Sequence, residues 1–233
     1  MSKTENTKAP LRETAQSPAE TTRAALVLSA LKLFGRQGFD GTSTRQIAAE
    51  ARANIGSIAY HFGGKEGLRI AAADYIVETI QAIAGQAIGN LPPPAAGTSG
   101  AEAAQAQLFM ALERMVGFIV ASPQAGEIVQ FVLRELSHPT AALDRIYEGV
   151  FEPTHRRICL IWEQATGEPA GSETTRLTVF TLIGQVIYFR IGREAVMRRM
   201  GWREIGNVEA GKIAAVVAGN LGAILAARKE GGS

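Results

Sequence analysis

Apolar side chains recur every three or four residues along most of the chain, and no segment alternates in the way that a strand requires. The last of these patterns, between residues 207 and 228, places Ile213, Val217 and Leu221 four residues apart. Residues at this spacing share one face of an α-helix. The sequence therefore predicts an all-α fold of about nine or ten helices.

Start and stop signals place these helices. Ser17, Pro18 and Glu20 predict a capping box at the start of the first helix, and Gly38 predicts its end. Later helices are expected at about 55–62, 65–89, 101–121, 124–137, 140–165, 172–199 and 207–228, with a proline-rich loop at 91–100. Residues 1–16 are polar and are expected to form a disordered tail.

The second and third helices are short and lie close together in the sequence. Ser43 with Gln46 predicts a capping box before the second, and Asn54 predicts the N-cap of the third. The third would turn its apolar residues inward, namely Ile55, Ile58 and Phe62. Its outer faces then carry Gly56, Ser57, Ala59, Tyr60 and His61. Such a pair suits a helix-turn-helix that lays one helix in the major groove of DNA, although all-α proteins that bind no DNA share the pattern.

The charge distribution favours this prediction only weakly. The whole chain carries 24 Lys+Arg against 22 Asp+Glu. Residues 20–69 hold seven basic and four acidic residues, whereas residues 70–233 hold 14 basic and 16 acidic ones. A basic excess beside the helix-turn-helix is what phosphate binding favours, but an ordinary solvated surface can carry the same excess.

The stretch from residue 22 to residue 68 resembles the N-terminal DNA-binding domain of TetR-family transcriptional regulators. The matching residues are Thr22-Arg23, Ala30-Leu31-Lys32-Leu33-Phe34, Gly38-Phe39, Thr42-Ser43-Thr44-Arg45-Gln46-Ile47-Ala48, Ala51, Tyr60-His61-Phe62 and Lys65-Glu66-Gly67-Leu68. The resemblance implies a homodimer that binds a palindromic operator in double-stranded DNA and releases it, as a repressor, when a small-molecule effector binds. It divides the chain into a tail (1–16), a helix-turn-helix domain (17–66) and a helical effector-binding and dimerisation domain (67–233).

The resemblance also implies a role for each matching position. Thr44, Tyr60 and Lys65 would contact phosphates. The groove-facing set would be Arg45, Asn54, Gly56, Ser57 and His61. The chain departs from the family at Arg52, where the family usually has glycine in the turn. A left-handed backbone there would cost an arginine about 1 kcal/mol, while its charge could extend the phosphate contacts.

The C-terminal two-thirds resembles the CecR (YbiH) subgroup of the family, in the runs from Phe131 to Thr140 and from Phe151 to Pro153. In this family the last two long helices pair with those of a second subunit, although here they could also be monomer core. The candidate ligand-binding residues are Phe118, Phe131, Arg134, Trp162, Gln185 and Tyr188. Aromatic residues at helical spacing are also ordinary core residues, and Arg134 with Glu135 could form structural salt bridges instead.

Several classes of function are disfavoured. The single cysteine, Cys159, excludes an intramolecular disulfide and suits a cytoplasmic protein; its apolar surroundings favour a buried thiol over a redox sensor. The three histidines, His61, His138 and His155, lack metal-ligand spacing, so no metal, cofactor or enzyme activity is predicted. No apolar run reaches the roughly 18–20 residues of a membrane span, and no secretory signal is present. The remaining alternative is a helical small-molecule-binding protein or adaptor without sequence-specific DNA binding.

Overall fold

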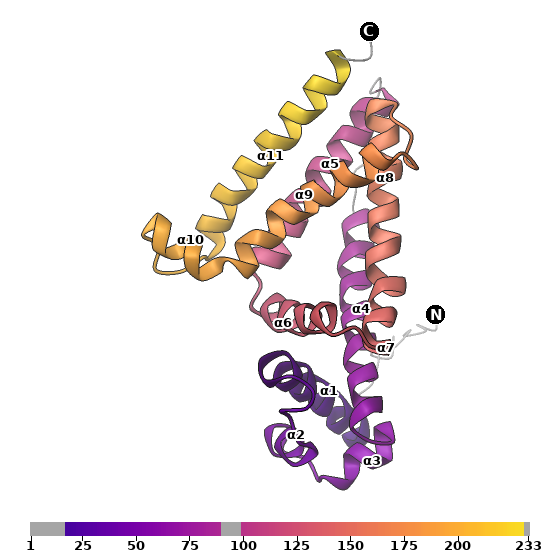
Figure 1. Ribbon diagram of the computed structural model, residues 1–233, viewed down its shortest axis with the longest axis vertical. Coiled ribbons are helices and arrows are strands. Elements are labelled where there is room, and N and C mark those ends of the chain that lie inside the picture. Colours follow the sequence, from indigo (N-terminus) through magenta and orange to yellow (C-terminus); the bar gives the residue numbers. More distant parts are fainter. Residues whose placement is uncertain (1–16, 90–98, 231–233) are drawn as a thin grey trace, which may run out of the picture.

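The computed structural model describes residues 17–89 and 99–230, and every regular element in these ranges is helical. Eleven α-helices and two π-helical turns confirm the all-α prediction. Figure 1 shows α1–α3 at one end of an elongated molecule and the C-terminal end of α11 near the other. The predicted tail and nearly all of the predicted loop lie outside the described residues; residue 100 of that loop already belongs to α5.

The first helix, α1 (Pro18–Gln37), begins and ends where the sequence predicts. The Ser17 hydroxyl accepts a hydrogen bond from the Glu20 N–H at 3.2 Å, and the Glu20 carboxylate accepts one from the Ser17 N–H at 2.8 Å. Gly38 ends the helix with a left-handed φ of 80°. The predicted capping box between Ser43 and Gln46 opens α2 (Thr44–Glu50), which is followed by α3 (Gly56–Phe62) and the long α4 (Lys65–Gly89).

The remaining helices follow the predicted ranges but contain breaks that the pattern does not reveal. The stretch 100–137 divides into α5 (Gly100–Val116), the π-helical turn η1 (Gly117–Ala121) and α6 (Pro123–Ser137). The stretch 140–165 divides into α7 (Ala141–Ile146), the π-helical turn η2 (Tyr147–Phe151) and α8 (Glu152–Thr166). The last three are α9 (Glu173–Ile191), α10 (Arg193–Met200) and α11 (Asn207–Glu230).

A single predicted helix over 172–199 is wrong because the chain turns at Gly192. The Gly192 N–H still bonds to the Tyr188 carbonyl at 2.7 Å, which closes α9. A Cβ at position 192 would lie 3.1 Å from both the ring and the carbonyl oxygen of Tyr188. Glycine permits this close approach, and α10 therefore projects to the side of the molecule (Figure 1).

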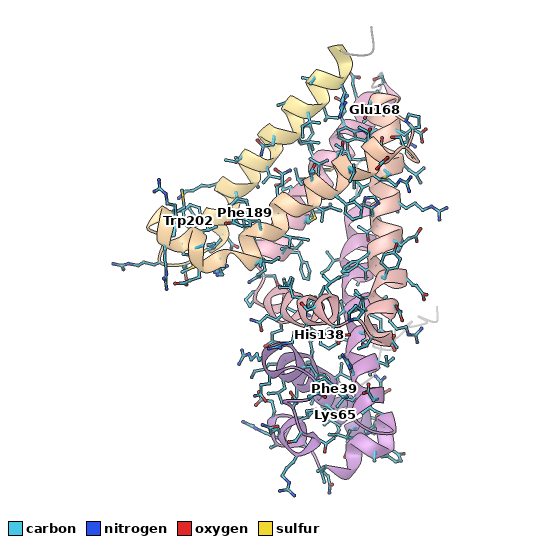
Figure 2. All side chains as sticks on the ribbon, in the orientation of Figure 1. Phe39, Lys65, His138, Glu168, Phe189 and Trp202 are labelled. Carbon is cyan, nitrogen blue, oxygen red and sulfur yellow. The ribbon has the colours of Figure 1, made fainter. Side chains whose placement is uncertain are left out.

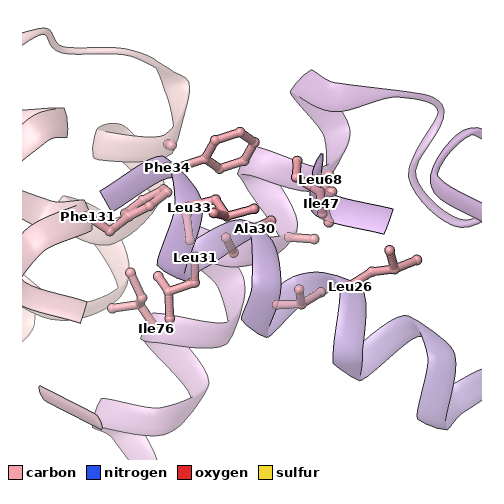
Figure 3. Packing of buried hydrophobic residues seen from close by; sticks show 14 of the residues in the cluster. Leu26, Ala30, Leu31, Leu33, Phe34, Ile47, Leu68, Ile76 and Phe131 are labelled. Atoms are coloured by element: carbon pink, nitrogen blue, oxygen red, sulfur yellow. The ribbon is translucent and has the colours of Figure 1, made fainter. Parts of the chain in front are cut away.

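The buried apolar residues form two cores. The first joins α1–α4 to α6 and α7, and Figure 3 shows Phe131 of α6 lying against Phe34 and Leu33 of α1. The second is built from α5, α8, α9 and α11 and includes Trp162, which is fully buried. Helices α1–α3 therefore share a core with α6 and α7, which lie more than fifty residues further along the chain.

Cys159 lies on α8 with 3% of its surface exposed, as a structural thiol would. Burial raises the pKa of the Cys159 thiol, so the thiol stays protonated near neutral pH. The sulfur lies 3.7 Å from Nδ1 of His155. The prediction of a buried cysteine is thus confirmed.

Two helical stretches have the length and hydropathy of a membrane span, which corrects the expectation that none would. They are Gly100–Ala121, with a mean hydropathy of 1.2, and Asn207–Arg228, with 1.6. Their many alanines raise the average without forming a long run of large apolar residues. Core helices of soluble proteins meet the same criterion, and both stretches contribute buried residues to the second core.

Candidate nucleic-acid interface

Helices α2 and α3 pack through small and apolar residues. Ile47, Ala48 and Ile58 are 0%, 4% and 1% exposed. The Ala53 N–H donates to the Ala48 carbonyl at 2.9 Å, so the turn folds back tightly onto α2. This close return is possible because Ala48 carries no bulk beyond Cβ. The two helices therefore form the predicted helix-turn-helix.

The turn between α2 and α3 contains Arg52, where the resemblance to the family leads one to expect glycine. Arg52 has a φ of 52°, and no other non-glycine among the described residues has a positive φ. The left-handed region is unfavourable for a residue with a Cβ. The Arg52 side chain is exposed, so no packing compensates for the strain.

An Arg52→Gly variant is expected to raise the free energy of unfolding by about 1 kcal/mol, because glycine adopts this φ without a Cβ clash. Chemical denaturation would measure the change. Arg52→Ala is the matched control: it removes the guanidinium but keeps the Cβ, and should leave stability near that of the parent chain. If alanine stabilised the chain as much as glycine, the backbone explanation would be wrong.

The outer side of α3 is open to solvent. Tyr60 is 84% exposed, and its ring meets the His61 ring edge-on at a centroid distance of 4.9 Å. Gly56 is exposed, and Ser57 is half-buried beside it. The first turn of α2 adds Arg45, which is exposed, and Thr44, which is half-buried. The structure thus places six of the eight predicted groove and phosphate residues on the neighbouring helices α2 and α3, with Asn54 in the turn between them and Lys65 at the start of α4.

Two predictions concern the start of α3. The regular helix begins at Gly56, and Ile55 before it already has helical φ and ψ of −57° and −34° but makes no side-chain capping bond. Asn54 supplies the predicted cap, because its side chain accepts a hydrogen bond from the Gly56 N–H at 2.8 Å. The predicted inward position of Ile55 is wrong, because its side chain is 49% exposed.

The first turn of α4 carries Lys65, whose ammonium lies 4.1 Å from the centroid of the Phe39 ring. Figure 2 shows Phe39 and Lys65 close together beside the helix-turn-helix. Glycines at 63 and 64, with φ of 71° and 136°, form the sharp turn between α3 and α4. Lys65 is therefore held at the edge of the surface that α2 and α3 present.

The six candidate ligand residues do not form one cluster. Phe131 is 1% exposed in the first core, and Phe118 packs against that core. Trp162 is fully buried in the second core and donates its indole N–H to Glu168 at 2.8 Å. Tyr188 is 58% exposed on α9. The six thus divide between two cores and an open helix face, and they do not outline a single pocket.

The other two candidates, Arg134 and Gln185, make hydrogen bonds to other helices. Arg134 donates to the carbonyl oxygens of Gly35 and Arg36, at the end of α1. Gln185 on α9 accepts a hydrogen bond from Asn220 on α11 at 3.0 Å. Arg134 therefore links α6 to the first helix, and Gln185 links the last two long helices.

Sequence reasoning did not foresee the junction between α6 and the first four helices. Glu135, which is 3% exposed, accepts a hydrogen bond from Arg69 of α4 at 2.8 Å. A cleft of 470 Å³ opens beside this ion pair, between the ends of α1 and α6 and the start of α4. The only sequence signal was the charged pair Arg134–Glu135 within an apolar run. Such a pair indicates that each buried charge has a partner, but it does not identify that partner.

These features define the class of protein: it is an all-α protein with an N-terminal helix-turn-helix and a larger helical part. Residues 26–72 match the family model for bacterial regulatory proteins of the tetR family. Residues 104–228, more than half of the chain, match the model for the C-terminal domain of the HTH-type transcriptional dual regulator CecR. The chain belongs to the TetR family of transcriptional regulators, with a CecR-type C-terminal domain.

Individual relatives agree with this assignment. The HTH-type transcriptional dual regulator CecR of Shigella flexneri is 31% identical over 189 residues, which cover 78% of this chain and 82% of that protein. The crystal structure of a putative transcriptional regulator from Pseudomonas aeruginosa PAO1 has the same fold, with a TM-score of 0.67 at 18% identity over 92% of this chain and 96% of that one. AibR, crystallised with isovaleryl coenzyme A and operator DNA, has a TM-score of 0.62 at 16% identity over 85% of this chain and 96% of that one. These relatives are regulators and not enzymes, as the sequence predicted for this chain.

Proposed function

We propose that this regulator acts in the cytoplasm as a homodimeric repressor. It binds a palindromic operator in double-stranded DNA through residues 17–66, and a small-molecule effector in residues 67–233 releases it. The observation that carries the DNA-binding part is the geometry of α3. Its inner side is buried at Ile58, and its outer side is open at Tyr60 and Gly56. An exposed second helix on a packed first helix is how a helix-turn-helix enters the major groove.

We assign two kinds of DNA contact to this surface. Thr44, Tyr60 and Lys65 bind phosphates, where they fix the orientation of the protein on the duplex. The residues that face base edges are Arg45, Asn54, Gly56, Ser57 and His61. At the start of α2, where Ser43 and Gln46 cap each other's N–H groups, Thr44 adds its own backbone N–H to its hydroxyl at the phosphate site.

Apolar residues left open on the last two long helices support the homodimer. On α9 they are Leu177, Phe180, Tyr188 and Ile191, and on α11 they are Val208 and Val216, each more than half exposed. A Cβ at Gly184 or Gly219 would meet nothing within 4 Å, so a partner helix can approach closely there. A surface this apolar on a soluble chain marks an interface, and a second copy of the same two helices would cover it.

The effector part of the proposal is supported by the helical domain itself. AibR, which shares this fold, was crystallised with isovaleryl coenzyme A as well as operator DNA. In this chain the second core of α5, α8, α9 and α11 is separate from the core that holds the helix-turn-helix. We therefore propose that the effector binds among the helices of residues 67–233, where Phe118 and Trp162 remain candidate contacts.

Fluorescence anisotropy with a DNA fragment from upstream of the chain's own coding region tests DNA binding. The parent chain should bind with a steep salt dependence. Lys65→Ala should lower the slope of log K against log salt by about two units per dimer, because each of the two subunits loses one phosphate contact. Tyr60→Phe should weaken binding severalfold with little change of slope, since it removes a hydroxyl and no charge.

Arg198→Ala is the matched control, because Arg198 is an exposed cation on α10 that pairs, within the described part of the chain, only with Glu194 of the same helix. It should bind like the parent chain. If no palindrome in the fragment were bound in a salt-sensitive manner, and if Lys65→Ala behaved like Arg198→Ala, the adaptor alternative would replace the repressor.

A further inference from the structure

A buried ion pair joins α6 to the start of α4. Nε of Arg69 donates to Oε1 of Glu135 at 2.8 Å, and the two side chains are 12% and 4% exposed. Thr140 donates its hydroxyl to the other carboxylate oxygen of Glu135 at 2.5 Å. Both oxygens of Glu135 are therefore engaged, and one of them holds Arg69 in place.

Arg69 in turn shares an aromatic ring with Lys65. The guanidinium carbon of Arg69 lies 4.5 Å from the centroid of the Phe39 ring, and the ammonium of Lys65 lies 4.1 Å from the same centroid. Phe39 belongs to the connection between α1 and α2, and Figure 2 places it beside Lys65. Cations over an aromatic face are attracted by its quadrupole, so Phe39 orients both side chains.

Helix α6 is also fixed to the end of α1. Arg134, the neighbour of Glu135, donates to the carbonyl oxygens of Gly35 and Arg36 at 2.9 and 2.8 Å. A Cβ on Gly35 would lie 3.1 Å from the backbone nitrogen of Phe131, so α1 and α6 are in close contact. The position of Glu135 relative to Phe39 is therefore set by packing and not by the ion pair alone.

We propose that Glu135 is a positioning residue for operator binding. Through Arg69 and Phe39, it holds Lys65 where Lys65 meets a phosphate. This inference rests on the proposed function, in which Lys65 makes that contact. When α6 moves, the carboxylate of Glu135 leaves Arg69, which keeps Glu66 of its own helix at 3.9 Å. Glu66 also lines the cleft beside the pair, which gives the guanidinium room to turn toward it and away from Phe39. The Phe39 ring then loses the cation that holds it against α4, and Lys65 loses the ring that orients it.

The change in overall charge predicts the opposite effect of neutralising Glu135 on DNA affinity, so the sign of the measured effect separates the two explanations. Removing a carboxylate makes the chain more positive, and a more positive protein binds DNA more tightly at a given salt concentration. A loss of affinity on neutralising Glu135 would therefore have to come from positioning.

A double-mutant cycle on the full chain tests this with the operator fragment. Glu135→Gln should weaken binding about tenfold and lower the salt slope by up to about two units per dimer, as Lys65→Ala does. In the Lys65→Ala background, Glu135→Gln should add less than about a twofold loss, because its route to DNA is already gone. Phe39→Leu, which keeps apolar bulk but removes the ring, should give the same loss and the same lack of additivity.

Asp74→Asn is the matched control, because Asp74 forms another ion pair between α4 and a later helix, with Arg145 of α7 at 3.3 Å. It should bind at least as tightly as the parent chain, and circular dichroism should show all variants folded. Equal fold-losses from Glu135→Gln in both Lys65 backgrounds, or an unchanged salt slope, would overturn the inference. An inert Lys65→Ala would instead overturn the phosphate role of Lys65 and, with it, both proposals at this site.

Discussion

Replacing Val216 with glutamate is expected to convert the chain into a monomer and to weaken operator binding by roughly 10²–10⁴-fold. Val216 is 62% exposed on α11, among the residues that we propose are covered by the second subunit. In a two-fold interface one substitution introduces two charges, one from each subunit, and both would be desolvated. Each helix-turn-helix would then bind its half-site independently of the other.

Light scattering after size exclusion would measure the mass, and binding to a full palindrome and to a half-site would measure the loss of avidity. Tyr147→Glu is the control, since Tyr147 is 55% exposed but lies on η2, outside α9 and α11. It should leave both the mass and the affinity unchanged. A Val216→Glu variant that remained dimeric and kept its affinity would show that this face is not the interface.

Replacing Gly67 with alanine is expected to lower the free energy of unfolding by about 1–3 kcal/mol, as overpacking does. The same variant should weaken operator binding by more than tenfold. A Cβ at position 67 would lie 1.9 Å from the carbonyl oxygen of Phe62, and a backbone atom cannot step aside as a flexible side chain can. The turn between α3 and α4 must therefore open, which displaces α3 together with Lys65.

Thermal unfolding and anisotropy on the same sample would measure the two effects of Gly67→Ala. Gly117→Ala is the matched control, because a Cβ there meets nothing within 4 Å and the residue lies in a helical conformation. It should be neutral or slightly stabilising. If Gly67→Ala matched Gly117→Ala in both measurements, the turn between α3 and α4 would be more tolerant than its geometry indicates.

The elements were predictable where the signal was local. A capping box needs only four consecutive residues, so Ser17 and Ser43 marked the starts of α1 and α2 correctly. The break at Gly192 was missed because glycine alone does not distinguish a turn from a close helix contact. Ile55 was assigned to the wrong face because helical spacing was extended one residue too far into the turn.

The site was predictable only in part. The exposed residues of α3 follow from its period, but the partner of Glu135 is Arg69, which lies 66 residues earlier in the chain. Such a pairing depends on how α6 crosses α1 and α4, and one sequence does not contain that crossing. For the same reason, aromatic residues that looked alike in the sequence, such as Phe131 and Tyr188, prove to be deeply buried in one case and exposed in the other.

The shared core of α1–α4 with α6 and α7 bears on how this regulator can be re-engineered. A hybrid regulator is commonly designed by fusing the DNA-binding domain of one protein to the effector-binding domain of another. In this chain the fusion point would lie near residue 66. Such a fusion would separate Leu31 and Phe34 from the α6 residues Ile128 and Phe131 that bury them. A functional hybrid would need either to transplant α6 and α7 together with the first four helices or to redesign the face of α1 for its new neighbour.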